Sequence, residues 1–276
     1  MVLRESDMQE LRNIQIEMLK CFVNVCDRLD LKYYILYGTL LGAVRHRGFI
    51  PWDDDIDVGM LRRDYECFIK NAQKLLPDYY FVQCLDSEKE YTMNMAKIRD
   101  SRTTFIESSV KTFDMNHGVY IDIFPLDYYP EAWVNKRIFE LKKRLFSQAV
   151  RSEYSSQGTT GVVKRVLTNG VHSLFGSGKK AARKLNSLYQ NQQKSNYLIN
   201  NSSPWGNEKE IMPCEWYGSG ITVNFEGLSV KAPQCTNEWL RHVYGNYMRL
   251  PPEEERITHH FTEIIDLHHS YKEYKR

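Results

Sequence analysis

YYILYGTLLGAVRHRGFIPWDDDIDVGM, residues 33–60, is the segment around which the rest of this chain is organised. Its apolar beginning predicts a strand over residues 33–37, and Gly38-Thr39 then turns the chain into a short helix. Four Asp in five positions follow, and the apolar character of residues 56–60 predicts a second strand.

Asp55 and Asp57 alternate with apolar residues, so in a strand both carboxylates face the same side. Two such carboxylates repel each other when they are partly buried without a counter-charge. A divalent cation removes that repulsion, and hard oxygen ligands suit Mg²⁺ or Mn²⁺. An acidic turn is the alternative. The neighbouring Gly-Thr turn and basic residues favour a site for metal and phosphate.

The same segment offers groups that could bind a phosphate. Gly38 permits a close backbone approach, and Thr39 is expected to cap the helix. The start of a helix presents unpaired N–H groups, which suit an anion, although a capped turn without a ligand is the alternative. Arg45 and His46 follow one to two turns later and could reach the same anion.

Residues 93–99, MNMAKIR, alternate like a strand that carries Lys97 and Arg99 on one face. Two cations so placed usually indicate an exposed edge strand. Beside a carboxylate and metal site they could instead hold a phosphate, with Arg99 supplying a bidentate fork.

Asp122 is the one charge in the apolar run GVYIDIFPL, residues 118–126. A charge in such a strand is rarely tolerated without a partner. Backbone N–H groups or an Arg could satisfy it in a purely structural role. The functional interpretation is a third carboxylate beside Asp55 and Asp57, which bridges a metal or accepts the proton of an attacking hydroxyl.

Composition sets the limits of these interpretations. The net charge of +2 gives no signal for nucleic acid, and 42% apolar residues suffice for a core. The six Cys form no CxxC pair, which favours reduced thiols in a cytoplasmic protein. The N-terminus is too polar for a signal peptide, and no run of about 18 apolar residues predicts a membrane span.

Charge is unevenly distributed along the chain. Residues 131–200 hold 13 Lys and Arg against three Glu, a net of +10. We interpret this part as a helical subdomain that lies against a membrane surface or an anionic substrate, with a solvated helical face as the alternative. The predicted division is a catalytic core at 1–130, a basic helical insertion at 131–205, and a C-terminal part at 206–276 that completes the catalytic domain.

The motifs resemble those of the LicD family of phosphotransferases. The resemblance is carried by GTLLGAVRHRGFIPWDDDIDV at 38–58, NMAKIRDSRTTF at 94–105, GVYIDIFPLD at 118–127, NFEGLSVKAP at 224–233, YGNYMRLPPEEER at 244–256, and His259-His260. It implies an α+β fold with a nucleotidyltransferase core of the polymerase-β type, a mixed sheet flanked by helices. In that core the Gly-Thr turn is Gly38-Thr39, the D-x-D strand carries Asp55 and Asp57, and the third Asp is Asp122.

The resemblance also implies a reaction, in which phosphocholine passes from CDP-choline to a sugar hydroxyl of a teichoic acid or lipopolysaccharide precursor and CMP is released. Asp55 and Asp57 would ligate two Mg²⁺ or Mn²⁺ ions, and Asp122 would share one ion and act as the base. Lys97, Arg99 and Arg45 would neutralise the diphosphate, and the Gly38-Thr39 turn would donate N–H groups to it. His46 could bind the same substrate, and His259, of the pair His259-His260, could reach the active site. Acceptors in this family are often lipid-linked, which implies a peripheral contact at the inner face of a membrane.

Other functions stay open at this point. The donor could be CDP-ribitol or CDP-glycerol, the enzyme could be a nucleotidyltransferase or a D-x-D glycosyltransferase, and an inactive relative is conceivable although all three Asp are present. A choline-binding module would normally show aromatic-glycine repeats, and the sequence has none. A choline cage would need aromatic residues, for which the candidates are Tyr128, Tyr129, Trp133, Trp205, Trp216 and Tyr217. The sequence does not indicate the acceptor sugar or the oligomeric state.

Overall fold

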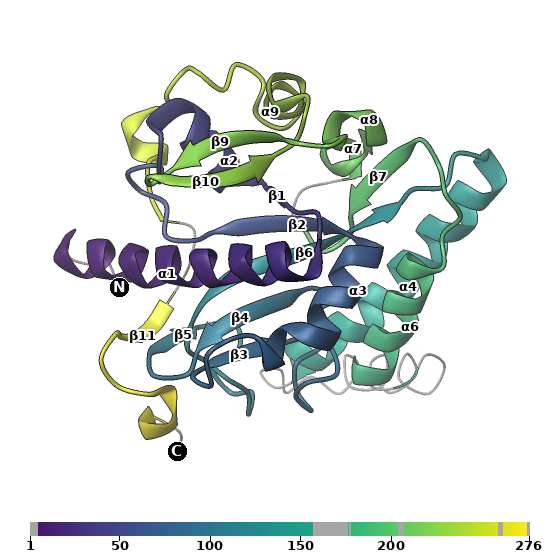
Figure 1. Ribbon diagram of the computed structural model, residues 1–276. Coiled ribbons are helices and arrows are strands. Elements are labelled where there is room, and N and C mark those ends of the chain that lie inside the picture. The colour runs from purple at the N-terminus through teal and green to yellow at the C-terminus, as the bar shows by residue number, and fades with distance from the viewer. Residues whose placement is uncertain (1–4, 157–175, 177, 204–206, 259–261, 275–276) are drawn as a thin grey trace.

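The computed structural model describes residues 5–156, 176, 178–203, 207–258 and 262–274. In this part of the chain a mixed sheet is surrounded by helices (Figure 1), which confirms the predicted α+β class. The seven strands of the sheet are β1 (Tyr34–Ile35), β2 (Asp57–Leu61), β3 (Tyr80–Gln83), β4 (Ala96–Asp100), β6 (Val119–Tyr128), β7 (Tyr197–Asn200) and β8 (Met212–Pro213).

The central strand is β6, whose ten residues are mostly apolar and are buried except for the last. β2 runs parallel to β6 on one side. On the other side two antiparallel strands pair with β6 in succession, β4 with its first half and β7 with its last three residues. This register places Asp57 opposite Asp122, and Asp122 opposite Lys97. Residues directly opposite one another on neighbouring strands point to the same face, so the pairing brings these three side chains together.

The long helix α1 (Glu5–Leu29) packs against β6 with its apolar stripe, as its three- and four-residue spacing predicts. Two polar side chains of α1 hold the aspartate-rich loop before β2. Gln15 Nε2 donates a hydrogen bond to the carbonyl of Asp54 at 2.8 Å. The Arg12 guanidinium donates to three carbonyls of the same loop, those of Ile50, Pro51 and Asp53.

Above the sheet in Figure 1 lies a layer built from both halves of the chain. Its elements are α2 (Tyr37–His46), α7 (Asn207–Glu210), α8 (Cys214–Tyr217), the hairpin of β9 (Ile221–Phe225) and β10 (Leu228–Ala232), and α9 (Thr236–Tyr244). Trp239 of α9 is fully buried and meets the Tyr37 ring edge-on, with 5.5 Å between the ring centroids. The C-terminal part of the chain thus packs directly on α2.

The remaining elements cover other parts of the sheet. They are α3 (Arg62–Asn71), η1 (Ala72–Lys74), the ribbon of β5 (Thr104–Glu107) and β11 (Thr262–Asp266), η2 (Glu253–Glu255) and η3 (Tyr271–Tyr274). Arg62 at the start of α3 makes a bidentate ion pair with Asp127 of β6, at 2.7 and 2.8 Å. That pair fixes the helix to the central strand.

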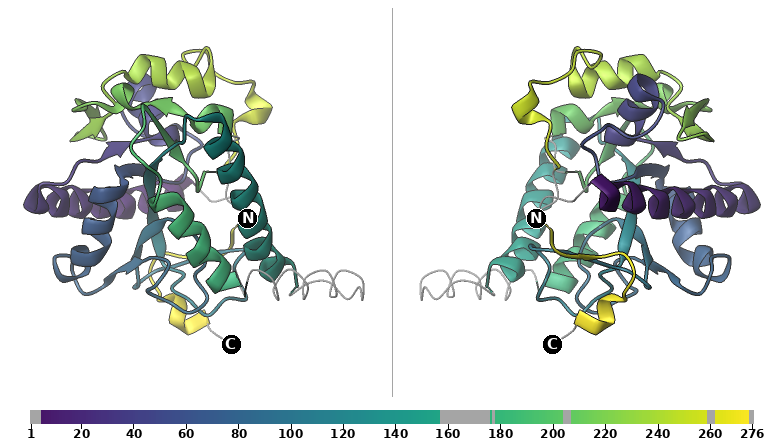
Figure 2. Two further views of the ribbon diagram at one scale, coloured as in Figure 1. Left: turned by 90° about the vertical axis from the view of Figure 1, so that its right-hand side faces the viewer. Right: turned by 90° about the vertical axis from the view of Figure 1, so that its left-hand side faces the viewer.

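Two helices of the basic middle, α4 (Trp133–Ser156) and α6 (Gly178–Gln190), lie side by side (Figure 2). Between them and β7 is a small separate apolar cluster, which contains Tyr129, Phe139, Leu185, Tyr189 and Ile199. No helix in the described part of the chain is long and apolar enough to cross a membrane. The predicted division of the chain into three parts stays a prediction.

Local differences from the sequence-based expectations have physical reasons. α2 begins at Tyr37, two residues before Thr39, so Thr39 is not its N-cap. β2 begins at Asp57, which leaves Asp55 in the preceding loop. Residues 211–216 have a strand-like pattern in the sequence. Only Met212–Pro213 forms a strand, because the chain turns into α8 after Pro213. α4 continues to Ser156, into a region whose Gly, Ser and Thr content predicts a loop.

Candidate active site

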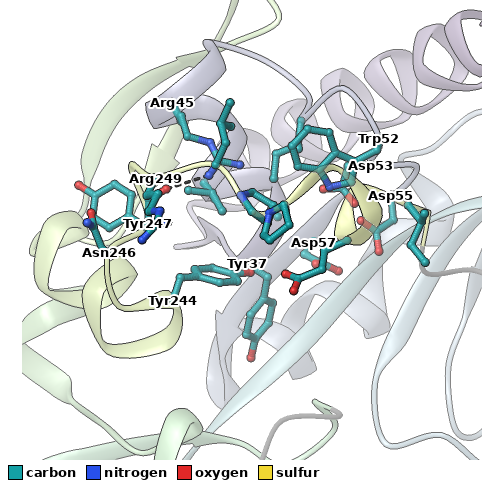
Figure 3. A pocket seen from close by; sticks show the side chains of 18 of the residues that line it. Tyr37, Arg45, Trp52, Asp53, Asp55, Asp57, Tyr244, Asn246, Tyr247 and Arg249 are labelled. Carbon is teal, nitrogen blue, oxygen red and sulfur yellow. Dashed lines mark hydrogen bonds between the residues drawn. The ribbon is translucent and has the colours of Figure 1, made fainter.

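A cavity of about 1190 Å³ opens between the sheet, the start of α2 and the segment after α9. Its walls consist of side chains from residues 37–57, from β6, and from residues 244–257, together with Ser203. Figure 3 shows Asp53, Asp55 and Asp57 on one side of the cavity and Arg45 and Arg249 on the other. Small-molecule sites typically span about 300–1,000 Å³, so the space suits a large ligand or two substrates.

The acidic wall is built by strand pairing. Asp57 and Asp122 are direct neighbours on the parallel strands β2 and β6, and their exposed fractions are only 9% and 7%. Asp53 and Asp55 line the same wall from the loop before β2. The structure therefore brings together all three carboxylates that the sequence singles out.

The environment of Asp57 shifts its pKa strongly. Burial raises its pKa well above the ordinary value, and the negative charges of Asp55, Asp122 and Asp53 raise it further. Lys97 opposes the shift without cancelling it. A carboxylate in this environment favours the uptake of a proton or of a metal ion.

Lys97 stands behind the acidic wall and does not line the cavity. Its Nζ lies 2.8 Å from Oδ1 of Asp122 and 3.3 Å from the centroid of the Tyr120 ring. Both members of this ion pair are almost fully buried. The negative charge of Asp122, in the apolar strand β6, is thus paired with the positive charge of Lys97 on β4.

Arg99 lies deeper still, with no exposed surface. It donates to Gln83 and to the carbonyl of Gly118, and its guanidinium sits 4.5 Å from the Tyr120 ring centroid. Because β4 lies between β6 and β3, the exposed-edge interpretation of Lys97 and Arg99 is wrong. A substrate contact by Arg99 stays a prediction that this burial does not favour.

The Gly-Thr turn serves the acidic loop. Thr39 is buried, and its Oγ1 accepts a hydrogen bond from the Asp57 backbone N–H at 2.8 Å. This bond ties α2 to the first residue of β2. A Cβ added to Gly38 would lie 2.3 Å from Oδ2 of Asp53, so glycine is required for the Asp53 carboxylate to approach the start of α2.

The opposite wall carries two arginines, Arg45 and Arg249, together with the acidic side chains of Glu254 and Glu255. Arg45 lines the cavity, and its Nη1 donates to the carbonyl of Tyr247 at 2.8 Å. Arg249 lines the same wall and is exposed. His46 does not line the cavity, and its ring meets Trp52 edge-on at 6.5 Å between centroids. His259 lies outside the described residues.

A buried hydrogen-bond network supports one end of the cavity. Glu210 is 2% exposed, and its carboxylate accepts from the Tyr37 hydroxyl at 2.6 Å and from Ser203. Asn200 in turn donates to the Tyr37 hydroxyl at 2.9 Å. Tyr37 and Ser203 both line the cavity, so Glu210 fixes two wall residues without reaching the cavity itself.

The sequence alone assigns no role to the C-terminal residues of the opposite wall. Tyr244, Asn246, Tyr247 and Arg249 all lie in the motif YGNYMRLPPEEER, which contributes to the family resemblance. That resemblance was the available signal, because nothing in the local pattern places these residues near Asp57. Five of the six candidates for a choline cage, Tyr128, Tyr129, Trp133, Trp216 and Tyr217, do not line the cavity. The sixth, Trp205, lies outside the described residues.

The donor set can be compared with the needs of a divalent cation. Among the described residues, no three His, Cys, Asp or Glu side chains form a ready ligand group. Mg²⁺ does not require one, because one or two carboxylates and substrate phosphates usually hold it. The purely oxygen donors Asp57, Asp122 and Asp55, with their excess of negative charge, fit such an ion.

Comparison with known proteins identifies the family. Residues 30–156 match the family described as LicD/FKTN/FKRP, nucleotidyltransferase domain. The chain is also 32% identical over 272 residues to the "Lipopolysaccharide cholinephosphotransferase LicD" of Haemophilus influenzae, an alignment that covers 96% of this chain and 100% of that protein. The chain belongs to the LicD family.

Two further relatives share shorter segments. An uncharacterized protein of Rickettsia prowazekii is 30% identical over 132 residues, which is 47% of this chain and 46% of that protein. The human "Ribitol 5-phosphate transferase FKRP" is 40% identical over 48 residues, which is 17% of this chain and 10% of that protein. The relatives named for an activity are phosphotransferases, and this LicD-family chain is an enzyme of that class.

Proposed function

We propose that this chain transfers phosphocholine from CDP-choline to a sugar hydroxyl of a cell-surface glycan precursor and releases CMP. The precursor would be of the lipopolysaccharide or teichoic acid type. The end-to-end similarity to a lipopolysaccharide cholinephosphotransferase supports this reaction. The structural observation that carries it is the buried pair of Asp57 and Asp122 facing a wall with two arginines.

The reaction assigns a task to each wall. Asp122 would accept the proton of the acceptor hydroxyl, whose oxygen attacks the phosphorus of the phosphocholine group. The bond from that phosphorus to the bridging oxygen breaks, and CMP leaves with the electron pair. Arg45 and Arg249 would neutralise the diphosphate, with the polymerase-β type of core as the proposed framework.

A divalent cation is part of the proposal. Asp55, Asp57 and Asp122 would hold Mg²⁺ or Mn²⁺, one ion or two, which would stabilise the negative charge that grows on the leaving phosphate. The raised pKa of Asp57 supports this assignment, because the ion would relieve the repulsion among these carboxylates.

The cavity also offers aromatic faces for a quaternary ammonium. Trp52 lines it on the acidic side, and Tyr244 and Tyr247 line the other wall (Figure 3). A choline headgroup is attracted to such rings through cation–π contacts. These three residues, rather than those favoured by the sequence, are the proposed choline contacts.

Phosphorus NMR tests the proposal with purified protein, Mg²⁺ and CDP-choline. We expect metal-dependent release of CMP, with water as a slow acceptor, and a loss of about 10²-fold or more in Asp57→Asn. Asp54→Asn is the matched control, because Asp54 belongs to the same run but does not line the cavity. Equal turnover in the folded Asp57→Asn variant and the wild type would contradict the site assignment.

The same assay separates the alternatives. Release of CMP from CDP-ribitol or CDP-glycerol, and not from CDP-choline, would show that another phospho-alcohol is transferred. The similarity to the ribitol 5-phosphate transferase is the reason to include CDP-ribitol. Release of pyrophosphate from a nucleoside triphosphate would indicate a nucleotidyltransferase. Choline binding without turnover of any donor would indicate a binding module.

A further inference from the structure

The helix α4 exposes an apolar stripe. Val134, Ile138, Leu141 and Leu145 are 57%, 47%, 59% and 38% exposed. Their spacing of four, three and four residues places them on one face of the helix. A different face, with Phe139 and Phe146, is the one packed against the protein. α4 therefore has two apolar faces, and its own fold covers one of them.

Basic side chains border the stripe. Arg137 and Arg144, seven residues apart, lie along one side of it, and Lys142 lies on the other. All three are exposed. The exposed charged side chains described on α4 are all basic, because Glu140 is half-buried and accepts a hydrogen bond from Tyr129.

A groove between α4 and α6 adds a second basic feature beside the stripe. Its volume is about 390 Å³, and it is lined by Lys142, Phe146, Arg183, Lys184, Ser187 and Leu188. Arg183 is paired with Asp86 at 2.8 Å. Lys142 and Lys184, together with the apolar Phe146 and Leu188, suit a ligand with a phosphate at one end and a hydrocarbon part at the other.

We infer that the exposed face of α4 is a docking surface for an anionic lipid membrane. The apolar stripe would enter the boundary between headgroups and acyl chains, as in other interfacial amphipathic helices. Arg137, Arg144 and Lys142 would contact lipid phosphates, and the groove beside α6 would take a headgroup. Charge complementarity favours this partner over a second copy of the chain, because two such faces would set cations against cations.

Vesicle co-sedimentation of the full chain tests the docking surface, with phosphatidylcholine vesicles that contain or lack phosphatidylglycerol. We expect binding only to the anionic vesicles, weakened by salt because the cationic contacts are exposed. The variant Ile138→Ser/Leu141→Ser and the variant Arg137→Glu/Arg144→Glu should each reduce the binding by about tenfold or more. Arg28→Glu/Lys32→Glu is the matched control, since it changes the net charge equally at the exposed end of α1.

The inference would be overturned if the wild type did not bind anionic vesicles at low salt. It would also be overturned if Arg28→Glu/Lys32→Glu lost as much vesicle binding as the α4 variants, or if Ile138→Ser/Leu141→Ser bound vesicles as well as the wild type. A dimer in light scattering that the apolar variant converts to a monomer, without vesicle binding, would assign the face to a second copy. The vesicle assay needs no substrate, and donor hydrolysis should be unchanged in every α4 variant. A failure of the docking inference is therefore distinguishable from a failure of the proposed reaction.

Discussion

At the scale of single residues, Glu210 gives the protein a pH dependence. Burial raises its pKa to about 7 from an ordinary value of 4.5, although Ser203 and Tyr37 donate hydrogen bonds to it. Between these two values the folded protein keeps the proton that the unfolded chain has lost. The free energy of unfolding should therefore fall as the pH rises through this window, by roughly 3 kcal/mol from this group alone.

Glu210→Gln should remove that part of the slope, because an amide does not titrate. Urea unfolding at a series of pH values from 4.5 to 7.5 measures it. Glu215→Gln, at an exposed position on the neighbouring helix α8, should leave the slope as in the wild type. If Glu210→Gln and the wild type lose stability equally over this window, the carboxylate is not titrating as its burial indicates.

Part of the site could be predicted from the residue types alone, as Asp122 shows. Asp122 is a lone charge in an apolar strand, and such a charge requires a partner wherever the strand is placed. The identity of the partner, Lys97, depends on the β4–β6 register, which the sequence does not specify. The sequence indicates Gly38 and Thr39 as a phosphate-binding turn, a role that stays a prediction. Their contacts, however, are with Asp53 and Asp57 rather than with the end of their own helix.

At the scale of elements, the pairing of β4 with β6 produces a strong prediction. Lys97→Met keeps the length of the side chain but leaves the Asp122 carboxylate buried without its cation. Removing one member of a buried ion pair typically costs about 3–5 kcal/mol. We therefore expect a loss of this order in the free energy of unfolding, measured with urea at neutral pH.

A double-mutant cycle provides the control for this loss. In Lys97→Met/Asp122→Asn both charges are removed, so the total cost should be clearly smaller than the sum of the two single costs. Strict additivity would mean that the 2.8 Å contact between Lys97 and Asp122 contributes nothing to the coupling of the two strands.

Elements differ in how well the sequence predicts them. The apolar patterns of α1 and β6 are long and clear, and they predict a helix over residues 5–29 and a strand over residues 118–126. The structure has both elements within two residues of these ends. α2 starts early because its first turn packs Tyr37 under Trp239, a tertiary contact with no local signal. α8 replaces a predicted strand for a similar reason, since Tyr217 is buried beneath α9 and its hydroxyl accepts from Trp239.

At the scale of the whole molecule, the cavity is the feature that the sequence could not predict. Its acidic wall comes from residues 53–57 and β6, whereas the opposite wall comes from Arg45 of α2 and from residues 244–257. The two walls meet because the C-terminal part of the chain packs on α2, and Arg45 is then hydrogen-bonded to Tyr247. No local pattern indicates an approach of segments about 200 residues apart.

This construction predicts that substrate should stabilise the whole fold. A ligand that touches both walls binds only the folded chain, and at a concentration 100 times its Kd it adds about 2.7 kcal/mol to the free energy of unfolding. For a chain of this size that corresponds to a rise in Tm of roughly 5 °C. We expect this rise in differential scanning fluorimetry with CDP-choline and Mg²⁺ together, and a smaller one with CDP-choline and EDTA.

Arg249→Gln tests whether the C-terminal wall takes part. Arg249 is exposed, so its replacement should leave the Tm without ligand nearly unchanged while most of the ligand-induced rise is lost. Arg241→Gln, at an exposed position of α9 that does not line the cavity, should keep the full rise. A full rise in Arg249→Gln would show that the ligand is held by the acidic wall alone, and the cavity would then be only a passage to that wall.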